Sequence, residues 1–256
     1  MKKRGQTTIF IIISILIISI IILFFIFKTD VISNIITSNE ISPNSFLQSC
    51  LEDEIEKGMG IISMQGGSIE NPLNKTFKFS EEDETNDISY LCYTDENNEF
   101  CVNQQSMLIA HVEKEIHDYI SEDVQDCLNN LEEDLRKSGY DVVKNYRDFE
   151  IDLMEKRISV KIDGEITSTK GEETSTKSGF EIFKNSNIYE LLIVAQKIVN
   201  YESTSCNFNY GLFMKNYPEF SIEKVRTSDL EIVYRIAHKK SGENFRFAIR
   251  GCVITL

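Results

Sequence analysis

The sequence predicts an α+β protein with a transmembrane helix near its N-terminus. We expect an extracytoplasmic domain to follow, in which amphipathic helices pack on antiparallel sheet and disulfides link the chain. Three observations predict this class. An uncharged apolar run fills residues 7–27, all six cysteines lie beyond it, and the helical and hairpin patterns that follow come in separate blocks. Such blocks favour an α+β fold over a parallel α/β sheet, in which helices and strands alternate.

The apolar run has the length and composition of a membrane span. It reads TTIFIIISILIISIIILFFIF and contains no charged residue, Pro or Gly. Its 21 residues would extend about 30 Å as a helix, the thickness of the hydrocarbon core of a bilayer. A secretory signal peptide has a shorter apolar region that ends in small residues at a cleavage site, whereas this run ends in Phe24, Phe25 and Phe27.

The charges beside the run predict its orientation. Three basic residues and no acidic residue lie in the leader, residues 1–6, whereas Lys28 and Asp30 behind the run nearly cancel. The positive-inside rule then places the N-terminus in the cytoplasm and the rest of the chain outside. We therefore expect a single-pass protein of the cell membrane, held by the lipid bilayer, with residues 28–42 as a stalk.

The first residues carry a resemblance to a known kind of leader. Lys3-Arg4-Gly5-Gln6, followed at once by a long apolar helix, resembles class III (type IV pilin-type) signal segments. It is also similar to the start of uncharacterised archaeal membrane-anchored envelope proteins that begin with an Arg-Gly-Gln run. In the pilin family a peptidase cuts after the Gly, and the retained helix packs into the core of a filament. The resemblance implies that Gly5 ends the leader and Gln6 begins the mature chain.

This resemblance covers about the first thirty residues and includes one departure. Bacterial pilins usually have Glu at the fifth mature position, where this chain has Phe10, although archaeal pilins are looser at this position. The alternative is an uncleaved signal anchor whose basic residues only set the topology.

The net charge of the chain argues against a nucleic-acid partner. The chain has a net charge of −14, and without the three basic residues before the apolar run this becomes −17, from 24 basic and 41 acidic residues. Because such a surface repels phosphates, we expect no nucleic-acid partner.

The cysteines indicate an exported, disulfide-bonded domain. An even number of cysteines beyond an anchor is typical of disulfides, and the absence of a C-x-x-C motif removes the main support for a zinc or thioredoxin-like site. Cys92 and Cys101 flank a polar turn and are expected to face each other across a hairpin. Cys50 and Cys127 each lie on the apolar stripe of a predicted helix and could join two packed helices. The remaining pair is Cys206 with Cys252; six free, buried thiols are the alternative.

The first half of the folded region, residues 43–139, reads as a helical and hairpin subdomain. Ser42-Pro43 is typical of a helix start, and Gly66-Gly67 of a helix end. A second amphipathic helix is predicted over residues 104–137. The apolar stripes of the two helices consist of Leu47, Leu51, Ile55 and Ile62, and of Leu108, Val112, Ile116, Ile120, Val124, Leu128, Leu131 and Leu135.

The second half, residues 140–256, reads as a β-rich α+β subdomain. Strand patterns occur over residues 149–153, 158–162 and 180–182, and two or three antiparallel strands close the chain. Residues 164–179 are rich in Thr, Ser, Lys and Glu, so we predict a mobile hairpin loop there. Asn187 with Glu190 resembles a capping box that begins a helix.

No residue pattern in the sequence indicates catalysis. The chain lacks G-x-S-x-G, phosphate-loop and dinucleotide-binding motifs, and we name no catalytic, cofactor-binding or metal-binding residue and expect no cofactor. His111 and His117 lie on different faces of the second predicted helix and are interpreted as exposed. The acidic stretch 81–84 is interpreted as a solvated loop, with a calcium site as the alternative. Asn74 lies in an Asn-x-Thr glycosylation sequon.

Two functional hypotheses follow from these observations. The first is a non-enzymatic cell-surface protein that serves as a pilin-like or envelope assembly subunit, with copies associating through the N-terminal helix. The second is a solitary extracytoplasmic binding or adhesion module, held by a signal anchor, that recognises an unknown surface partner. A membrane-tethered enzyme is a weaker third alternative.

Overall fold

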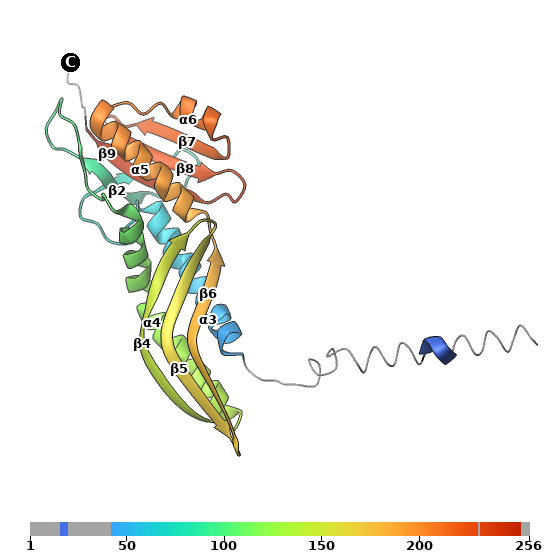
Figure 1. Ribbon diagram of the computed structural model, residues 1–256. Coiled ribbons are helices and arrows are strands. Elements are labelled where there is room, and N and C mark those ends of the chain that lie inside the picture. The colour runs from blue at the N-terminus through green and yellow to red at the C-terminus, as the bar shows by residue number, and fades with distance from the viewer. Residues whose placement is uncertain (1–15, 20–41, 230, 252–256) are drawn as a thin grey trace, which may run out of the picture. The chain divides into compact units, whose positions relative to one another are not determined.

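The protein is described here by a computed structural model, which covers residues 16–19, 42–229 and 231–251 (Figure 1). The chain divides into two units, residues 1–42 and residues 43–256, and the second is called the folded unit below.

Little of the first unit lies within the described residues. Residues 16–19 are helical. None of the helices in the described part of the chain is long and apolar enough to cross a membrane. The leader with Gly5 and Gln6, most of the predicted span over residues 7–27 and nearly all of the predicted stalk lie outside the described residues, and they stay predictions.

The folded unit is α+β, as predicted, and its strands form two separate sheets. In chain order its elements are α3 (Pro43–Met64), β1 (Asn74–Phe77), β2 (Asn86–Tyr93), β3 (Val102–Asn103), α4 (Leu108–Lys137), β4 (Asp141–Met154), β5 (Arg157–Lys170), β6 (Glu173–Asn185), α5 (Ile188–Ser205), α6 (Tyr210–Asn216), β7 (Phe220–Arg226), β8 (Ile232–His238) and β9 (Asn244–Arg250).

Helices α3 and α4 lie antiparallel and bury the two predicted apolar stripes. Helix α3 begins at Pro43 as expected, because the fixed φ of proline suits a first helical turn. It ends before Gly66 and Gly67, whose φ angles of 79° and 96° suit glycine. Helix α4 begins at Leu108 and not at Gln104, because the Gln104 N–H donates to the carbonyl of Leu91 at 2.9 Å beside strand β3.

Two of the three predicted disulfides lie within the described residues, and both are present. Cys50–Cys127 joins α3 to α4 with a Cα–Cα distance of 5.9 Å, and Cys92–Cys101 closes the loop between β2 and β3 with a distance of 5.3 Å. The hairpin register differs from the prediction, since Cys92 lies opposite Asn103. None of the described cysteines is free. Cys252, the predicted partner of Cys206, lies outside the described residues.

One sheet is a long three-stranded antiparallel ribbon in the order β4-β5-β6. The prediction of a loop over residues 164–179 is wrong, because these residues form a hairpin that is mostly strand. Strand β5 continues to Lys170, β6 begins at Glu173, and the hairpin turns at Gly171, whose φ of 64° suits a two-residue turn. Thr is a good strand former, and facing Thr side chains bond across the ladder, so this polar stretch forms strands although only Gly164 and Ile166 in it are buried.

The other sheet is mixed and follows the order β1-β2-β9-β8-β7, with β3 paired to β2. Its closing strands β7, β8 and β9 are antiparallel, as predicted. Strand β2, however, pairs parallel to β9, with Tyr90 beside Ala248. No short turn connects these two strands, so nothing local dictates an antiparallel pairing. This pairing joins residues from both predicted subdomains, 43–139 and 140–256, whose division stays a prediction.

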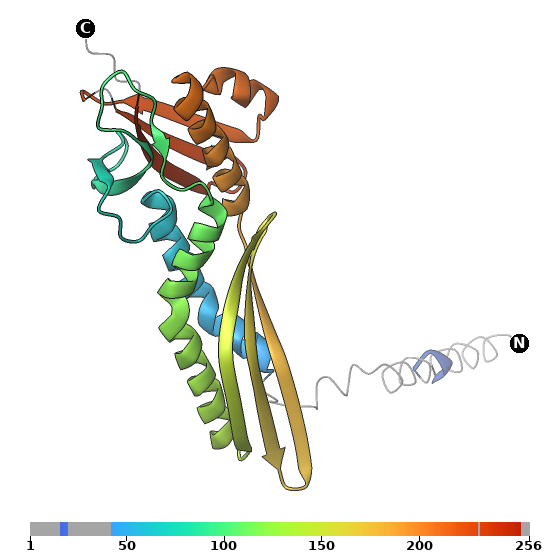
Figure 2. The ribbon, with the colours of Figure 1, turned by 60° about the vertical axis from the view of Figure 1, so that its left-hand side comes forward.

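The helix pair contacts both sheets. Helix α3 packs against β6 of the long ribbon and β9 of the mixed sheet, whereas α4 packs against β4 and α5. Figure 2 shows α3 and α4 side by side along the ribbon, with α5 lying across the mixed sheet. Both sheets therefore depend on one helix–helix contact for their placement.

That contact includes a close approach at Gly58. A Cβ added to Gly58 would lie 2.6 Å from Cδ1 of Tyr119 on α4, whereas nothing lies within 4 Å of a Cβ added to Gly60. In a helix interior, alanine is more favourable than glycine by about 1 kcal/mol. At Gly58 the tight contact with Tyr119 opposes that gain.

We predict that Gly58→Ala lowers the free energy of unfolding by about 1–2 kcal/mol, because overpacking outweighs helix propensity. Urea unfolding of the full chain in detergent, followed by circular dichroism, measures this. Gly60→Ala is the matched control and should be neutral or stabilising. In a Tyr119→Ala background the loss at position 58 should disappear, and equal losses in both backgrounds would contradict the proposed contact.

Candidate functional site

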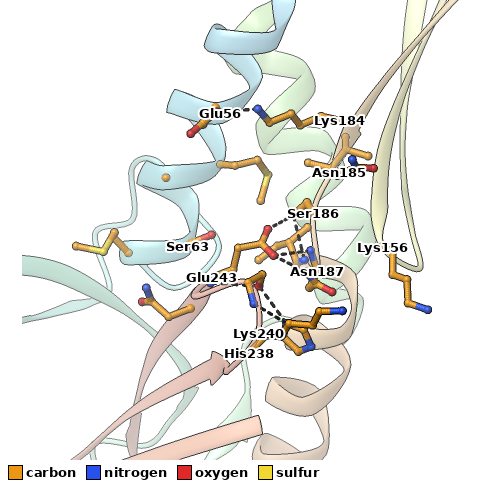
Figure 3. Close-up of a pocket in the computed structure, with 17 residues that line it drawn as sticks. Glu56, Ser63, Lys156, Lys184, Asn185, Ser186, Asn187, His238, Lys240 and Glu243 are labelled. Carbon is orange, nitrogen blue, oxygen red and sulfur yellow. Dashed lines mark hydrogen bonds and ion pairs between the residues drawn. The ribbon is translucent and has the colours of Figure 1, made fainter. Parts of the chain in front are cut away.

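A groove of about 940 Å³ opens where four segments of the folded unit meet (Figure 3). The C-terminal half of α3 forms one wall. The β4–β5 turn, the junction of β6 with α5 and the β8–β9 turn form the others. The groove therefore lies between the two sheets and combines residues that are far apart in the sequence.

Glu243 in the β8–β9 turn holds the β6–α5 junction. Its carboxylate accepts hydrogen bonds from Ser186 Oγ at 2.6 Å, from the Asn187 N–H at 2.8 Å and from the Asn187 side-chain amide at 2.7 Å. Figure 3 shows the carboxylate pointing at these two residues. The position also suits the helix dipole, since negative charge is favourable beside the first turn of α5.

The predicted capping box of Asn187 and Glu190 is wrong, although the helix begins where expected. The side chain of Asn187 accepts no bond from α5 and donates to Glu243. Ser186 Oγ accepts the Ile188 N–H at 3.1 Å. Glu190 accepts the N–H of Lys156 at 3.1 Å and so fixes the β4–β5 turn. Asn187 and Glu190 therefore bond to residues of other segments and do not form the capping box.

The hydrogen bonds around Glu243 keep it ionised. Burial raises the pKa of this carboxyl, but bonds from Ser186, Asn187 and Ser241 favour the charged form and lower the pKa below its ordinary value overall. The Glu243 carboxylate is therefore a fixed anion beneath the groove.

Three lysines give the groove a basic rim on an acidic protein. Lys184 donates to Glu56 at 2.7 Å and to Glu52 at 3.1 Å. Its pKa is raised, chiefly by the bond to Glu56, while burial opposes the shift. Lys156 lies exposed on the β4–β5 turn and Lys240 on the β8–β9 turn (Figure 3). Lys184 is tied to α3, and Lys156 lies 3.4 Å from the carboxylate of its exposed neighbour Glu155. An exposed pair of this kind is weak, so Lys156 and Lys240 can still contact a ligand.

The floor of the groove is partly apolar. Met59, Ile158 and Ile188 line it and are buried, whereas Asn185, which also lines the groove, is exposed. The groove therefore combines an apolar floor, neutral hydrogen-bonding groups and exposed lysines at the rim. This composition suits the binding of an anionic ligand with some apolar surface.

The acidic stretch 81–84 has arginine partners, so its interpretation as a simple solvated loop is wrong in part. Glu82 binds Arg246 through both carboxylate oxygens, and Glu81 pairs with Arg235. The guanidinium groups of Arg235 and Arg246 lie 4.5 and 5.1 Å from the ring centroid of the buried Phe79. Within the described residues no group of three or more His, Cys, Asp or Glu side chains is placed to hold a metal ion.

The two helical histidines are half-buried, and their interpretation as exposed is corrected. His111 Nε2 lies 2.8 Å from Ser68 Oγ in the segment that follows α3. His117 stacks on Phe149, with the ring centroids 4.2 Å apart. Both therefore contribute to packing between α4 and neighbouring segments.

Asn74 begins strand β1 and is partly buried. Its side-chain amide donates to the carbonyl of Asn71 at 2.6 Å, beside a polar hollow of about 390 Å³. Glycosylation at this sequon stays a prediction.

None of the groove residues was identified from the sequence as a site. Lys156, Lys240 and Glu243 are charged residues in predicted turns, where charged residues are common. Only the pairing of the two sheets around α3 brings them together. Comparison of the chain with protein-family models, curated protein sequences and solved structures gives no match.

We predict that Glu243→Gln lowers the free energy of unfolding at pH 7 by about 1–3 kcal/mol, because buried donors lose a charged acceptor. The folded-state pKa is depressed, so the contribution is present above the ordinary value of 4.5 and is lost as pH falls below it. The difference between wild type and variant should shrink accordingly in chemical unfolding between neutral and acid pH. The exposed Glu172→Gln is the control and should stay within about 0.5 kcal/mol. A difference independent of pH would contradict this role.

Proposed function

We propose that this chain is a non-enzymatic, membrane-anchored cell-surface protein whose folded unit binds an anionic partner. The observation that carries the proposal is the groove, with exposed Lys156 and Lys240 at its rim and an apolar floor beneath. In a chain with a net charge of −14, a lysine-rimmed groove is a local exception that would attract negative charge.

Several titratable side chains of the groove already have hydrogen-bond or ion-pair partners within the protein, which favours binding over catalysis. Glu243 is ionised and fully engaged by Ser186 and Asn187, Glu56 is paired with Lys184, and His238 Nδ1 lies 3.0 Å from Ser241 Oγ. A general acid or base needs a proton that it can exchange with a substrate. These side chains are instead used to fix the walls of the groove.

The location outside the cell is part of the proposal. The uncharged run over residues 7–27 and the basic residues before it support an anchor with a cytoplasmic N-terminus. The disulfides Cys50–Cys127 and Cys92–Cys101 support the same side of the membrane for the folded unit, because disulfides persist in oxidising compartments.

A second candidate function is an assembly subunit in which the N-terminal helix associates with copies of itself. The observation that favours it is the run Arg4-Gly5-Gln6 before a long apolar segment, which resembles a pilin-type leader. The two candidates share the anchor and the folded unit and differ in what the N-terminal helix contacts.

We predict that the full chain in detergent binds poly-glutamate or polyphosphate, and more weakly as salt is added. Lys156→Glu combined with Lys240→Glu should weaken binding about tenfold or more, because two attractions become repulsions. Lys78→Glu combined with Lys215→Glu, at two exposed positions outside the groove lining, is the control of equal charge change and should have little effect. Titration calorimetry measures each affinity. Equal weakening by the control, or no binding of either probe, would count against the groove.

The mature N-terminus separates the two candidates. An assembly subunit of the pilin type predicts a chain that begins at Gln6, and a solitary module predicts one that begins at Met1. Intact-mass spectrometry of protein extracted from its native membrane without reductant distinguishes them. The same spectrum, compared with that of a reduced sample, counts the disulfides.

A further inference from the structure

The distal part of β6 is an open sheet edge. Residues 173–179 read ETSTKSG, and all seven are exposed. In the order β4-β5-β6, strand β6 pairs with β5 and has no other strand partner within the described residues. Its outer N–H and C=O groups are therefore a template for another strand.

This edge is complementary to itself. If two copies pair antiparallel about Ser175, residues whose numbers sum to 350 lie opposite each other. Glu173 then faces Lys177 of the second copy in both directions, and Thr174 faces Thr176. Opposite charges directly across a ladder are stabilising, whereas like charges are destabilising. The stretch also carries no net charge, so two strongly acidic chains can approach there with little repulsion.

The ribbon already contains the contacts that such a pairing would repeat. Thr167 and Thr176 have hydroxyl oxygens 3.0 Å apart, and Thr169 and Thr174 have theirs 3.1 Å apart. Pairing about Ser175 would place Thr174 against Thr176 of the second copy on the same face of the sheet. The row of facing threonines would then continue across the new junction.

Register shifts interrupt both outer strands of the ribbon. Strand β4 has a register shift between Tyr146 and Asp148, which interrupts its ladder. A bulge of this kind twists a strand and discourages edge pairing. Strand β6 has its shift at Gly179, between Ser178 and Phe180, whereas its register with β5 is regular from Glu173 to Ser178, and this regular part contains the proposed pairing.

We infer that the β6 edge, over residues 173–177, pairs antiparallel with the same edge of a second copy, centred on Ser175. The two three-stranded ribbons then form one continuous sheet of six strands. This contact is separate from the N-terminal helix and from the groove, and it requires neither leader cleavage nor a groove ligand.

Cysteine cross-linking of the full chain in its native membrane tests this pairing. In Ser175→Cys the two introduced side chains lie directly opposite, with Cβ atoms about 5 Å apart. A mild oxidant should therefore give a covalent dimer on a non-reducing gel, and peptide mass spectrometry should find the 175–175 link.

Ser178→Cys is the matched control, since it makes the same change at an equally exposed position of the same strand. In the proposed register its two copies lie six residues apart along the strands, about 20 Å, and should not link. Equal linking of both variants would indicate random collision and overturn the proposal. Absence of a dimer from Ser175→Cys, or linking to a different protein, would also overturn it.

The proposed pair of Glu173 with Lys177 of the second copy provides a second test of the register. In the Ser175→Cys chain, Glu173→Lys places two lysines opposite each other at both ends and should reduce the dimer yield several-fold. Adding Lys177→Glu restores opposite charges and should restore the yield. Failure of this rescue would exclude the proposed register. Because the N-terminal mass and the groove affinity are measured separately, loss of the dimer would leave the proposed function standing.

Discussion

The antiparallel contact between α3 and α4 is the constraint on which the rest of the folded unit depends. The helices approach closely because Gly58 leaves room for the ring of Tyr119, and the Cys50–Cys127 bond fixes the same pair at its other end. The long ribbon packs on this pair through β4 and β6, and the mixed sheet packs on α3 through β9. The two sheets share no strand pairing, so the groove between them depends on the helix pair and on the bonds from Glu243 to Ser186 and Asn187.

The acidity of the chain is partly structural. Several carboxylates lie inside the folded unit with specific partners and do not simply solvate its surface. Glu202 is buried and accepts from the Tyr234 hydroxyl, from Lys224 at 2.8 Å and from the Phe208 N–H at 3.1 Å. Burial and the bond to Glu202 raise the pKa of Tyr234, so its hydroxyl stays a donor. Such groups lose stability when one partner is removed, because an unpaired buried charge is costly.

The two proposed contact surfaces lie at opposite ends of one strand. Strand β6 begins at the open edge around Ser175 and ends at Asn185 in the wall of the groove. Ten residues of strand separate these points, about 33 Å, so pairing at one end need not obstruct a ligand at the other. A sheet continued through two copies would present two grooves to a surface. Two linked sites bind a repeated partner more strongly than one site does, if the spacing fits.

The sequence by itself determined the elements whose signals are local. The stripes of α3 and α4, the strands β8 and β9 and the pairing of Cys92 with Cys101 follow from periodicity and short spacing, and the described structure contains them, although β8 and β9 are buried along consecutive residues and not in alternation. Tertiary structure decided the rest. The polar, Thr-rich stretch forms strands because β5 and β6 pair and their threonines face each other. Asn187 bonds to Glu243 of a distant turn and does not cap α5. Parallel pairing of β2 with β9 and the composition of the groove depend on residues more than a hundred positions apart, and no local pattern records which distant segments a folded chain brings together.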